Sequence, residues 1–206
     1  TPLYSSAASD VYKRQAFARE TGAIIASDEC YLYLGWATEP VSVLHPSVTG
    51  GDNTGLLALH SLSKTSNLAS YRCGMISGDE ALVQELLEVR KHAGLIVPGP
   101  IQHAMVAALE SDLHEEMQRS AYASRRLELL KALPDAGFTV DHSDAGLYLW
   151  VRREGMDSRQ ALDWFADRGI LGAPGDFYGP AGASHVRIAL TAPDEKITKA
   201  ARRITQ

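Results

Sequence analysis

The chain has 206 residues, 45% hydrophobic and 22% charged, which are the proportions of an ordinary globular protein. Its net charge of −5, with acids and bases mixed along the chain, argues against nucleic acid as a partner. No apolar run is long enough for a membrane span, no signal peptide is evident, and no Cys/His cluster has zinc spacing, so neither a membrane nor a metal is expected. The two cysteines, Cys30 and Cys73, favour a reducing compartment, and we expect a cytoplasmic location.

The first fifteen residues, TPLYSSAASDVYKRQ, are polar and rich in Ser and Ala, with no clean period. The next stretch, AFARETGAIIASDE, indicates the end of a helix, a glycine just after it and then a buried strand. A chain that opens inside a helix-to-strand unit is typical of a piece of a longer protein. We therefore interpret residues 1–15 as a leader that is not native to the fold.

Three short apolar runs, at 23–28, 56–61 and 73–77, predict buried strands. Asp79 is expected to cap a helix that runs to about residue 92, and GLIVPGP at 94–100 interrupts it. Residues 101–133 have a helical pattern with a bend near 111–112, and such a long stretch suits a connector between domains.

Pro134 is expected to end that segment, after which the pattern changes. Strands are predicted at 138–140, 147–151, 170–173 and 185–190. Helices are predicted at 158–168, capped by Ser158, and at 193–204, with Pro193 as the first helical residue. We expect an α/β protein in which residues 16–118 form part of a large domain with a mostly parallel sheet, and residues 119–206 form a small α+β domain.

Polar groups gather where the first strands end, and the carboxyl ends of parallel strands meet at one crevice. An amine, a carboxylate, a phenol, hydroxyls and a guanidinium are the groups that pyridoxal phosphate needs. A lysine forms a Schiff base with its aldehyde, a carboxylate holds its ring nitrogen protonated, and arginine with hydroxyls binds its phosphate. The candidates are Asp28, Tyr31, Ser61, Ser63, Lys64 and Arg72.

The motifs SDECY and SLSKTSNLASYRCG resemble those of the fold-type I, class I/II aminotransferases. The resemblance implies that Lys64 forms the Schiff base and shuttles the proton. It implies that Asp28 binds the pyridine nitrogen and Tyr31 the ring hydroxyl. The phosphate would be held by Ser61, Ser63 and Arg72.

Further segments extend the resemblance over residues 16–206, with DAGLYLW and APGDFYGPAGASHVRIALTAPDE similar to small-domain strands of the family. It implies that Arg187 grips the substrate α-carboxylate. Together with RKHAGLIVPGP, these segments are most similar to the actinobacterial type of succinyldiaminopimelate aminotransferase. The resemblance therefore implies a homodimer in lysine biosynthesis that moves an amino group between N-succinyl-LL-2,6-diaminopimelate and 2-oxoglutarate.

Two departures from the family stand out. The family has glycine where Ser70 stands, and serine would cost about 1 kcal/mol there if the position required a positive φ. The family's glycine-containing phosphate loop, its ring-stacking aromatic residue and its Asn-Pro segment do not occur before Asp28. The chain therefore resembles the C-terminal half of such an enzyme or a little more, and we expect it to be inactive alone.

Each candidate also has a structural explanation. Lys64 and Arg72 are of types common at surfaces, Asp28 suits a cap, and Arg187 suits a solubility charge on an edge strand. Tyr178 either lines the site or packs a turn. His60, His92, His103 and His142 are interpreted as structural. Three other functions stay open: a lyase or decarboxylase with the same cofactor, a ligand-sensing regulator, and a fragment without activity.

Overall fold

The computed structural model describes residues 7–94 and 96–206, with side chains from Lys13 onward. The chain divides into two compact units that meet between Gln118 and Arg119, inside one long helix. The first six residues of the predicted leader lie outside the described residues, and from Ala7 the chain is helical. The assignment of the units to a cofactor domain and a small domain stays a prediction.

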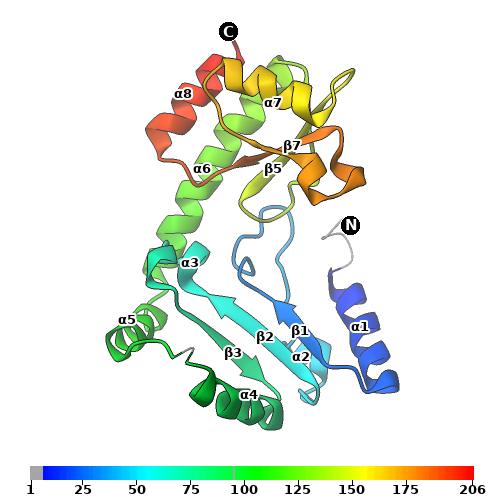
Figure 1. Ribbon diagram of the computed structural model, residues 1–206, viewed down its shortest axis with the longest axis vertical. Coiled ribbons are helices and arrows are strands. Elements are labelled where there is room, and N and C mark those ends of the chain that lie inside the picture. The colour runs from blue at the N-terminus through cyan, green and yellow to red at the C-terminus, as the bar shows by residue number, and fades with distance from the viewer. Residues whose placement is uncertain (1–6, 95) are drawn as a thin grey trace. The chain divides into compact units, whose positions relative to one another are not determined.

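The first unit alternates helices with three strands (Figure 1). Its elements are α1 (Ala7–Thr21), β1 (Ile25–Asp28), α2 (Pro46–Thr49), β2 (Leu56–Ser61), α3 (Leu62–Thr65), the 3₁₀ turn η1 (Ala69–Tyr71), β3 (Gly74–Gly78), α4 (Glu80–Ala93), α5 (Gly99–Leu109) and the start of α6 (Leu113–Asp135). Buried Val43, Leu56 and Ala58 form a small core, against which Ile25 and Leu44 pack.

The sheet of the first unit is mixed, in the order β1-β2-β3. Strands β1 and β2 are parallel, with Asp28 opposite Leu59, whereas β3 is antiparallel to β2, with Gly74 opposite Ser61. Strand β3 is the antiparallel member of a sheet that we expected to be mostly parallel. Because β3 runs backwards, its first residue lies at the same sheet edge as the last residue of β2.

Helix boundaries follow local chemistry. Asp79 caps α4 as expected, since its Oδ1 accepts from the backbone amides of Ala81 and Leu82 at 2.9 and 3.3 Å. The bend expected near residues 111–112 is a break in the helix, because α5 ends at Leu109 and α6 begins at Leu113. Pro134 was expected to end this helix, but it lies inside the last turn of α6, which ends one residue later at Asp135.

The second unit packs helices on a four-stranded antiparallel sheet of order β4-β5-β7-β6. After α6 come β4 (Phe138–Asp141), β5 (Tyr148–Arg153), α7 (Ser158–Asp167), β6 (Ala173–Pro174), the 3₁₀ turns η2 (Gly175–Tyr178) and η3 (Pro180–Gly182), β7 (His185–Ala189) and α8 (Asp194–Ile204). The strand predicted at 170–173 is reduced to the two residues of β6, which contain a proline.

Two predicted caps are displaced by one residue. Asp157, not Ser158, caps α7, in a reciprocal capping box with Gln160. Pro193 is the N-cap residue of α8 and not its first helical residue. The carboxylate of Asp157 reaches two backbone amides, at 2.8 and 2.9 Å, which explains why the preceding acid begins the helix.

Alternation along β7 separates a buried face from a polar face. Val186 and Ile188 are 0% and 5% exposed, whereas His185 and Arg187 are only partly buried and lie on the other face. The buried face lies with core residues that include Val151 of β5 and Phe165 of α7, both fully buried. This pattern places Arg187 on the polar face of a central strand.

Two glycines let the turns before β7 approach each other. A Cβ on Gly182 would lie 2.0 Å from the carbonyl oxygen of Gly175, and a Cβ on Gly175 would lie 2.3 Å from the carbonyl oxygen of Gly182. Neither distance is compatible with a side chain. The path of residues 175–182 therefore depends on both glycines.

We predict that Gly182→Ala destabilises the protein by about 1–3 kcal/mol, as expected for overpacking against a fixed backbone. Thermal unfolding followed by circular dichroism measures the effect. Gly99→Ala is the control, because no atom lies within 4 Å of the added methyl. Equal unfolding temperatures for Gly182→Ala and the wild type would contradict the close approach of these turns.

Candidate active site

Lys64 lies on α3, a single helical turn that begins directly after β2. Ser61 caps this turn, since its Oγ accepts from the Ser63 amide at 3.1 Å. The Ser61 hydroxyl is also the donor of hydrogen bonds to Oγ of Ser63, at 2.9 Å, and to the Cys73 carbonyl oxygen, at 3.3 Å. Two neighbouring hydroxyls and a lysine are therefore held together at the end of a strand.

The amine of Lys64 has no hydrogen-bond or ion-pair partner among the described residues. The Lys64 side chain is partly buried. A lysine in this position is available to react with an aldehyde, as a lysine engaged with a carboxylate would not be.

Arg72 precedes β3, and the antiparallel direction of β3 brings its backbone to the Ser61 edge. Its side chain does not join the serines. The guanidinium is exposed, and its Nη1 donates to the Ala69 carbonyl at 2.9 Å. Arg72 adopts a left-handed backbone, with φ of 52°, whereas Ser70 lies in η1 without a positive φ. The serine at position 70 therefore fits without backbone strain.

Asp28 ends β1 beside β2, and its Oδ1 accepts from the Cys30 amide at 3.1 Å. The pKa of the Cys30 thiol is raised to about 11, first by burial and then by the side-chain hydrogen bond and negative charge of Asp28. The positive charge of Lys64 acts in the opposite direction. Asp28 and Lys64 are thus both close enough to Cys30 to influence its ionisation. Tyr31 follows in a turn, and its carbonyl accepts from the Leu34 amide at 3.0 Å.

A buried acid behind Asp28 was not among the predicted site residues. Glu29 is 7% exposed, and its Oε1 accepts from the Val43 amide at 2.7 Å. Its Oε2 lies 3.5 Å from Nε2 of His60, the residue before Ser61. The pair joins the ends of β1 and β2, so His60 supports the site edge. Only the position of Glu29 directly after a predicted strand could have pointed to it.

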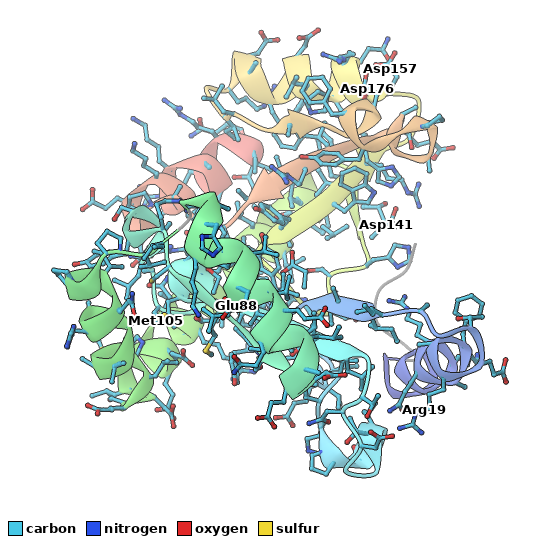
Figure 2. The ribbon with its side chains drawn as sticks, turned by 60° about the horizontal axis from the view of Figure 1, so that its bottom comes forward. Arg19, Glu88, Met105, Asp141, Asp157 and Asp176 are labelled. Carbon is cyan, nitrogen blue, oxygen red and sulfur yellow. The ribbon has the colours of Figure 1, made fainter. Side chains whose placement is uncertain are left out.

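A separate pocket of about 450 Å³ lies between β3, α4 and α5. Its lining is mostly aliphatic and includes Ile76, Leu86 and Met105, of which Figure 2 labels Met105. None of the candidate residues lines this pocket. We therefore place the candidate site at the edge formed by Asp28, Ser61 and Lys64.

Within the described ranges, no group of three or more His, Cys, Asp or Glu side chains suits a metal ion. None of the described helices has the length and apolar character of a membrane crossing.

Arg187, in the second unit, lies opposite Trp150 of β5 and Ala173 of β6. Because β7 has a neighbour on each side, Arg187 is not a charge on an edge strand, and that structural alternative is excluded. Its guanidinium carbon lies 4.1 Å from the centre of the Tyr148 ring and 5.1 Å from that of Tyr178. Tyr178 therefore contacts a candidate ligand residue and does more than pack a turn.

The model of the family "Aminotransferase class I and II" matches residues 9–204. This chain belongs to that family. Its members are pyridoxal-phosphate-dependent enzymes, so the predicted family, fold and cofactor class are confirmed. The match includes every candidate residue from Asp28 to Arg187.

Three curated relatives illustrate the similarity. The chain is 63% identical to probable aminotransferase Rv1178 of Mycobacterium tuberculosis, over 92% of this chain and 45% of that protein. It is 57% identical to 4-dedimethylamino-4-oxo-anhydrotetracycline transaminase OxyQ of Streptomyces rimosus, over 92% and 53%. It is 35% identical to LL-diaminopimelate aminotransferase of Aquifex aeolicus, over 95% and 51%. The chain thus spans about half the length of the curated relatives it matches.

A solved aminotransferase from Neisseria meningitidis Z2491 has the same fold, with a TM-score of 0.85 and 29% identity. The similarity covers 96% of this chain and 52% of that one.

We predict that Cys30 alkylates slowly at pH 8, because a thiol with a pKa of about 11 is almost entirely protonated there and the thiolate is the nucleophile. Asp28→Asn removes a charge that raises this pKa and should speed alkylation about tenfold, the effect of about one pKa unit. Iodoacetamide labelling across pH 7–11, assigned to Cys30 by peptide mass spectrometry, measures both.

Glu85→Gln is the matched control, because it removes one negative charge that does not act on Cys30. Its labelling rate should equal that of the wild type. An unchanged rate in Asp28→Asn would show that the Asp28 carboxylate does not influence Cys30.

Proposed function

We propose that this chain supplies the lysine, the ring-nitrogen partner and the carboxylate-binding arginine of an aminotransferase. The observation that carries the proposal is the Lys64 amine, which has no hydrogen-bond or ion-pair partner among the described residues and sits on a turn capped by Ser61. The family assignment supports it, because the cofactor class of the family requires a reactive lysine.

When bound, pyridoxal phosphate supplies an aldehyde for amines and a ring that withdraws electrons from the substrate α-carbon. Lys64 would hold that aldehyde covalently and, once released, take the proton from the substrate α-carbon. Asp28 would accept a hydrogen bond from the protonated ring nitrogen, and Tyr31 would donate one to the ring hydroxyl. Each role needs a group at the edge where β1 and β2 end.

The phosphate would be bound by the hydroxyls of Ser61 and Ser63 and by Arg72. The two hydroxyls already lie 2.9 Å apart. Arg72 would have to leave the Ala69 carbonyl, and its exposed side chain makes such a rotation inexpensive.

We further propose N-succinyl-LL-2,6-diaminopimelate as amino donor, 2-oxoglutarate as acceptor and a place in lysine biosynthesis. The LL-diaminopimelate aminotransferase of Aquifex aeolicus supports the class of donor. The more similar OxyQ is named for a tetracycline intermediate that carries an oxo group, so related chains are named for different substrates. A homodimer in the cytoplasm follows from the resemblance to the family and stays a prediction.

The Lys64 proposal is tested by mixing the chain with pyridoxal phosphate and recording absorbance. We expect a band at the edge of the visible range that borohydride fixes to one peptide, the one containing Lys64. Lys64→Ala should lose both the band and the labelled peptide, because no amine remains at that position.

Lys91→Ala is the control for nonspecific reaction, since Lys91 is an exposed lysine that pairs with Glu88 on α4. It should keep the band at wild-type intensity. Identical spectra for the wild type and Lys64→Ala would contradict cofactor attachment at Lys64 in this chain.

The substrate proposal is tested with the full-length protein, by following transfer from glutamate to oxo acids. N-succinyl-2-amino-6-oxopimelate should be the preferred acceptor. A rate no higher than with other oxo acids would refute the substrate while leaving the reaction class intact.

A further inference from the structure

Arg187 is a partly buried cation whose described contacts are aromatic. Its guanidinium carbon lies over the rings of Tyr148 and Tyr178, at 4.1 and 5.1 Å from their centres. No carboxylate pairs with it among the described residues. A buried charge usually has an anionic partner, so the lack of one beside two rings calls for a physical explanation.

Aromatic rings stabilise a guanidinium without neutralising it. The ring face attracts the cation, while the planar N–H donors remain able to bind a carboxylate in the plane of the guanidinium. An acidic neighbour would also stabilise Arg187, but it would compete with a carboxylate ligand for the same donors. Two rings therefore favour a cation that is held in place and still free to bind an anion.

We propose that Tyr148 and Tyr178 are positioning residues that hold the Arg187 guanidinium ready for a carboxylate ligand. The inference rests on the proposed function, in which Arg187 binds the α-carboxylate of the substrate. It adds two residues and a means of holding the arginine, through ring faces and not through hydroxyl groups.

Tyr148 owes its position to the sheet. It lies on β5, opposite Ala189 of β7, two residues along the strand from the Trp150–Arg187 pair. Side chains two residues apart on one strand lie on the same face, so Tyr148 and Trp150 share the polar face with Arg187. Tyr148 is therefore fixed by backbone pairing.

Tyr178 owes its position to the turns before β7. Gly175 and Gly182 meet too closely for side chains, as described above, and Asp176 accepts from Nε of Arg159 on α7 at 2.9 Å. Figure 2 labels Asp176 and Asp157 at this end of α7. These contacts lie at the start of η2, and Tyr178 at its end packs its ring edge-on to that of Trp150, with ring centres 5.7 Å apart.

The Trp150 ring is held in turn by a stacked neighbour, His185. His185 stacks on it, with ring centres 5.0 Å apart and planes 11° apart, and Nε2 of His185 lies 3.0 Å from Oδ2 of Asp141. Burial would raise the pKa of Asp141, but hydrogen bonds from His185 and Arg152 outweigh it and lower that pKa, so the carboxylate stays ionised at neutral pH. The Asp141 carboxylate is thus engaged with His185 and Arg152.

The test uses the whole chain, with glutarate as a simple dicarboxylate and its uncharged diamide, glutaramide, as the matched ligand. Nitrogen-15 NMR follows the Nε–Hε signal of Arg187, which is assigned by its loss in Arg187→Lys. We expect a saturable shift with glutarate and none with glutaramide, because only the former carries carboxylates.

Tyr178→Leu and Tyr148→Leu should each raise the dissociation constant for glutarate about 2- to 10-fold, the range expected for one lost cation–π contact. Tyr178→Phe and Tyr148→Phe keep the ring face and should stay within about twofold of the wild type. Arg187→Lys, which loses the planar fork, should weaken binding more than either leucine variant; tryptophan fluorescence follows binding where the arginine signal is absent.

Phe177→Leu is the matched control. Phe177 precedes Tyr178 in η2 and is 70% exposed, but its ring lies 5.0 Å from the guanidinium of Arg159 and does not contact Arg187. It should bind glutarate as the wild type does. Circular dichroism melting confirms that each variant is folded before its affinity is compared.

The outcomes separate the two ideas. Wild-type affinity in both leucine variants, with loss in Arg187→Lys, would overturn the positioning role of the tyrosines and leave the role of Arg187 standing. Wild-type affinity in Arg187→Lys would overturn the proposed role of Arg187 itself. Phenylalanine variants as weak as the leucine variants would refute the ring-face mechanism, and a wild-type signal that ignores glutarate would refute the whole inference. None of these results depends on the Lys64 spectrum.

Discussion

The antiparallel pairing of β3 with β2 is the constraint on which the candidate site depends. Ser61 ends one strand opposite Gly74, which begins the other, so two residues with twelve others between them in the chain lie at one sheet edge. The hydrogen bond from Ser61 Oγ to the Cys73 carbonyl joins the two sides of this edge at 3.3 Å. Without the pairing, α3 would be an isolated turn, because a helix of four residues does not hold itself together in water. The backbone that presents Lys64 is therefore stabilised by the sheet.

The sequence predicts those features of the fold that depend on neighbouring residues, such as helix caps and the two faces of a strand. The acid at position 79 precedes an amphipathic pattern and caps α4, and alternation along β7 correctly set Arg187 apart from Val186 and Ile188. The errors lie where neighbouring residues compete. Asp157 and Ser158 are both good caps, and only the geometry of the turn, with Gln160 reaching back, gives the role to the acid.

What could not be predicted depends on contacts between distant segments. The direction of β3 is not encoded in a five-residue apolar run, because parallel and antiparallel strands of that length have the same pattern. The partner of His60, a buried Glu29 from another strand, is equally invisible to periodicity. The same holds for the rings around Arg187, since Tyr148 and Tyr178 are thirty residues apart and meet through sheet register and two glycines.

The left-handed backbone at Arg72 means that the residue with the lower backbone strain, glycine, lacks the guanidinium that arginine provides. A residue with a side chain stores about 1 kcal/mol of strain at a φ near 52°, whereas glycine adopts that conformation freely. A population of variants selected only for resistance to unfolding would therefore drift from arginine to glycine here, and would lose the guanidinium as it gained stability. If arginine is retained at this site under selection for activity, its charge must contribute more to activity than glycine would contribute to stability.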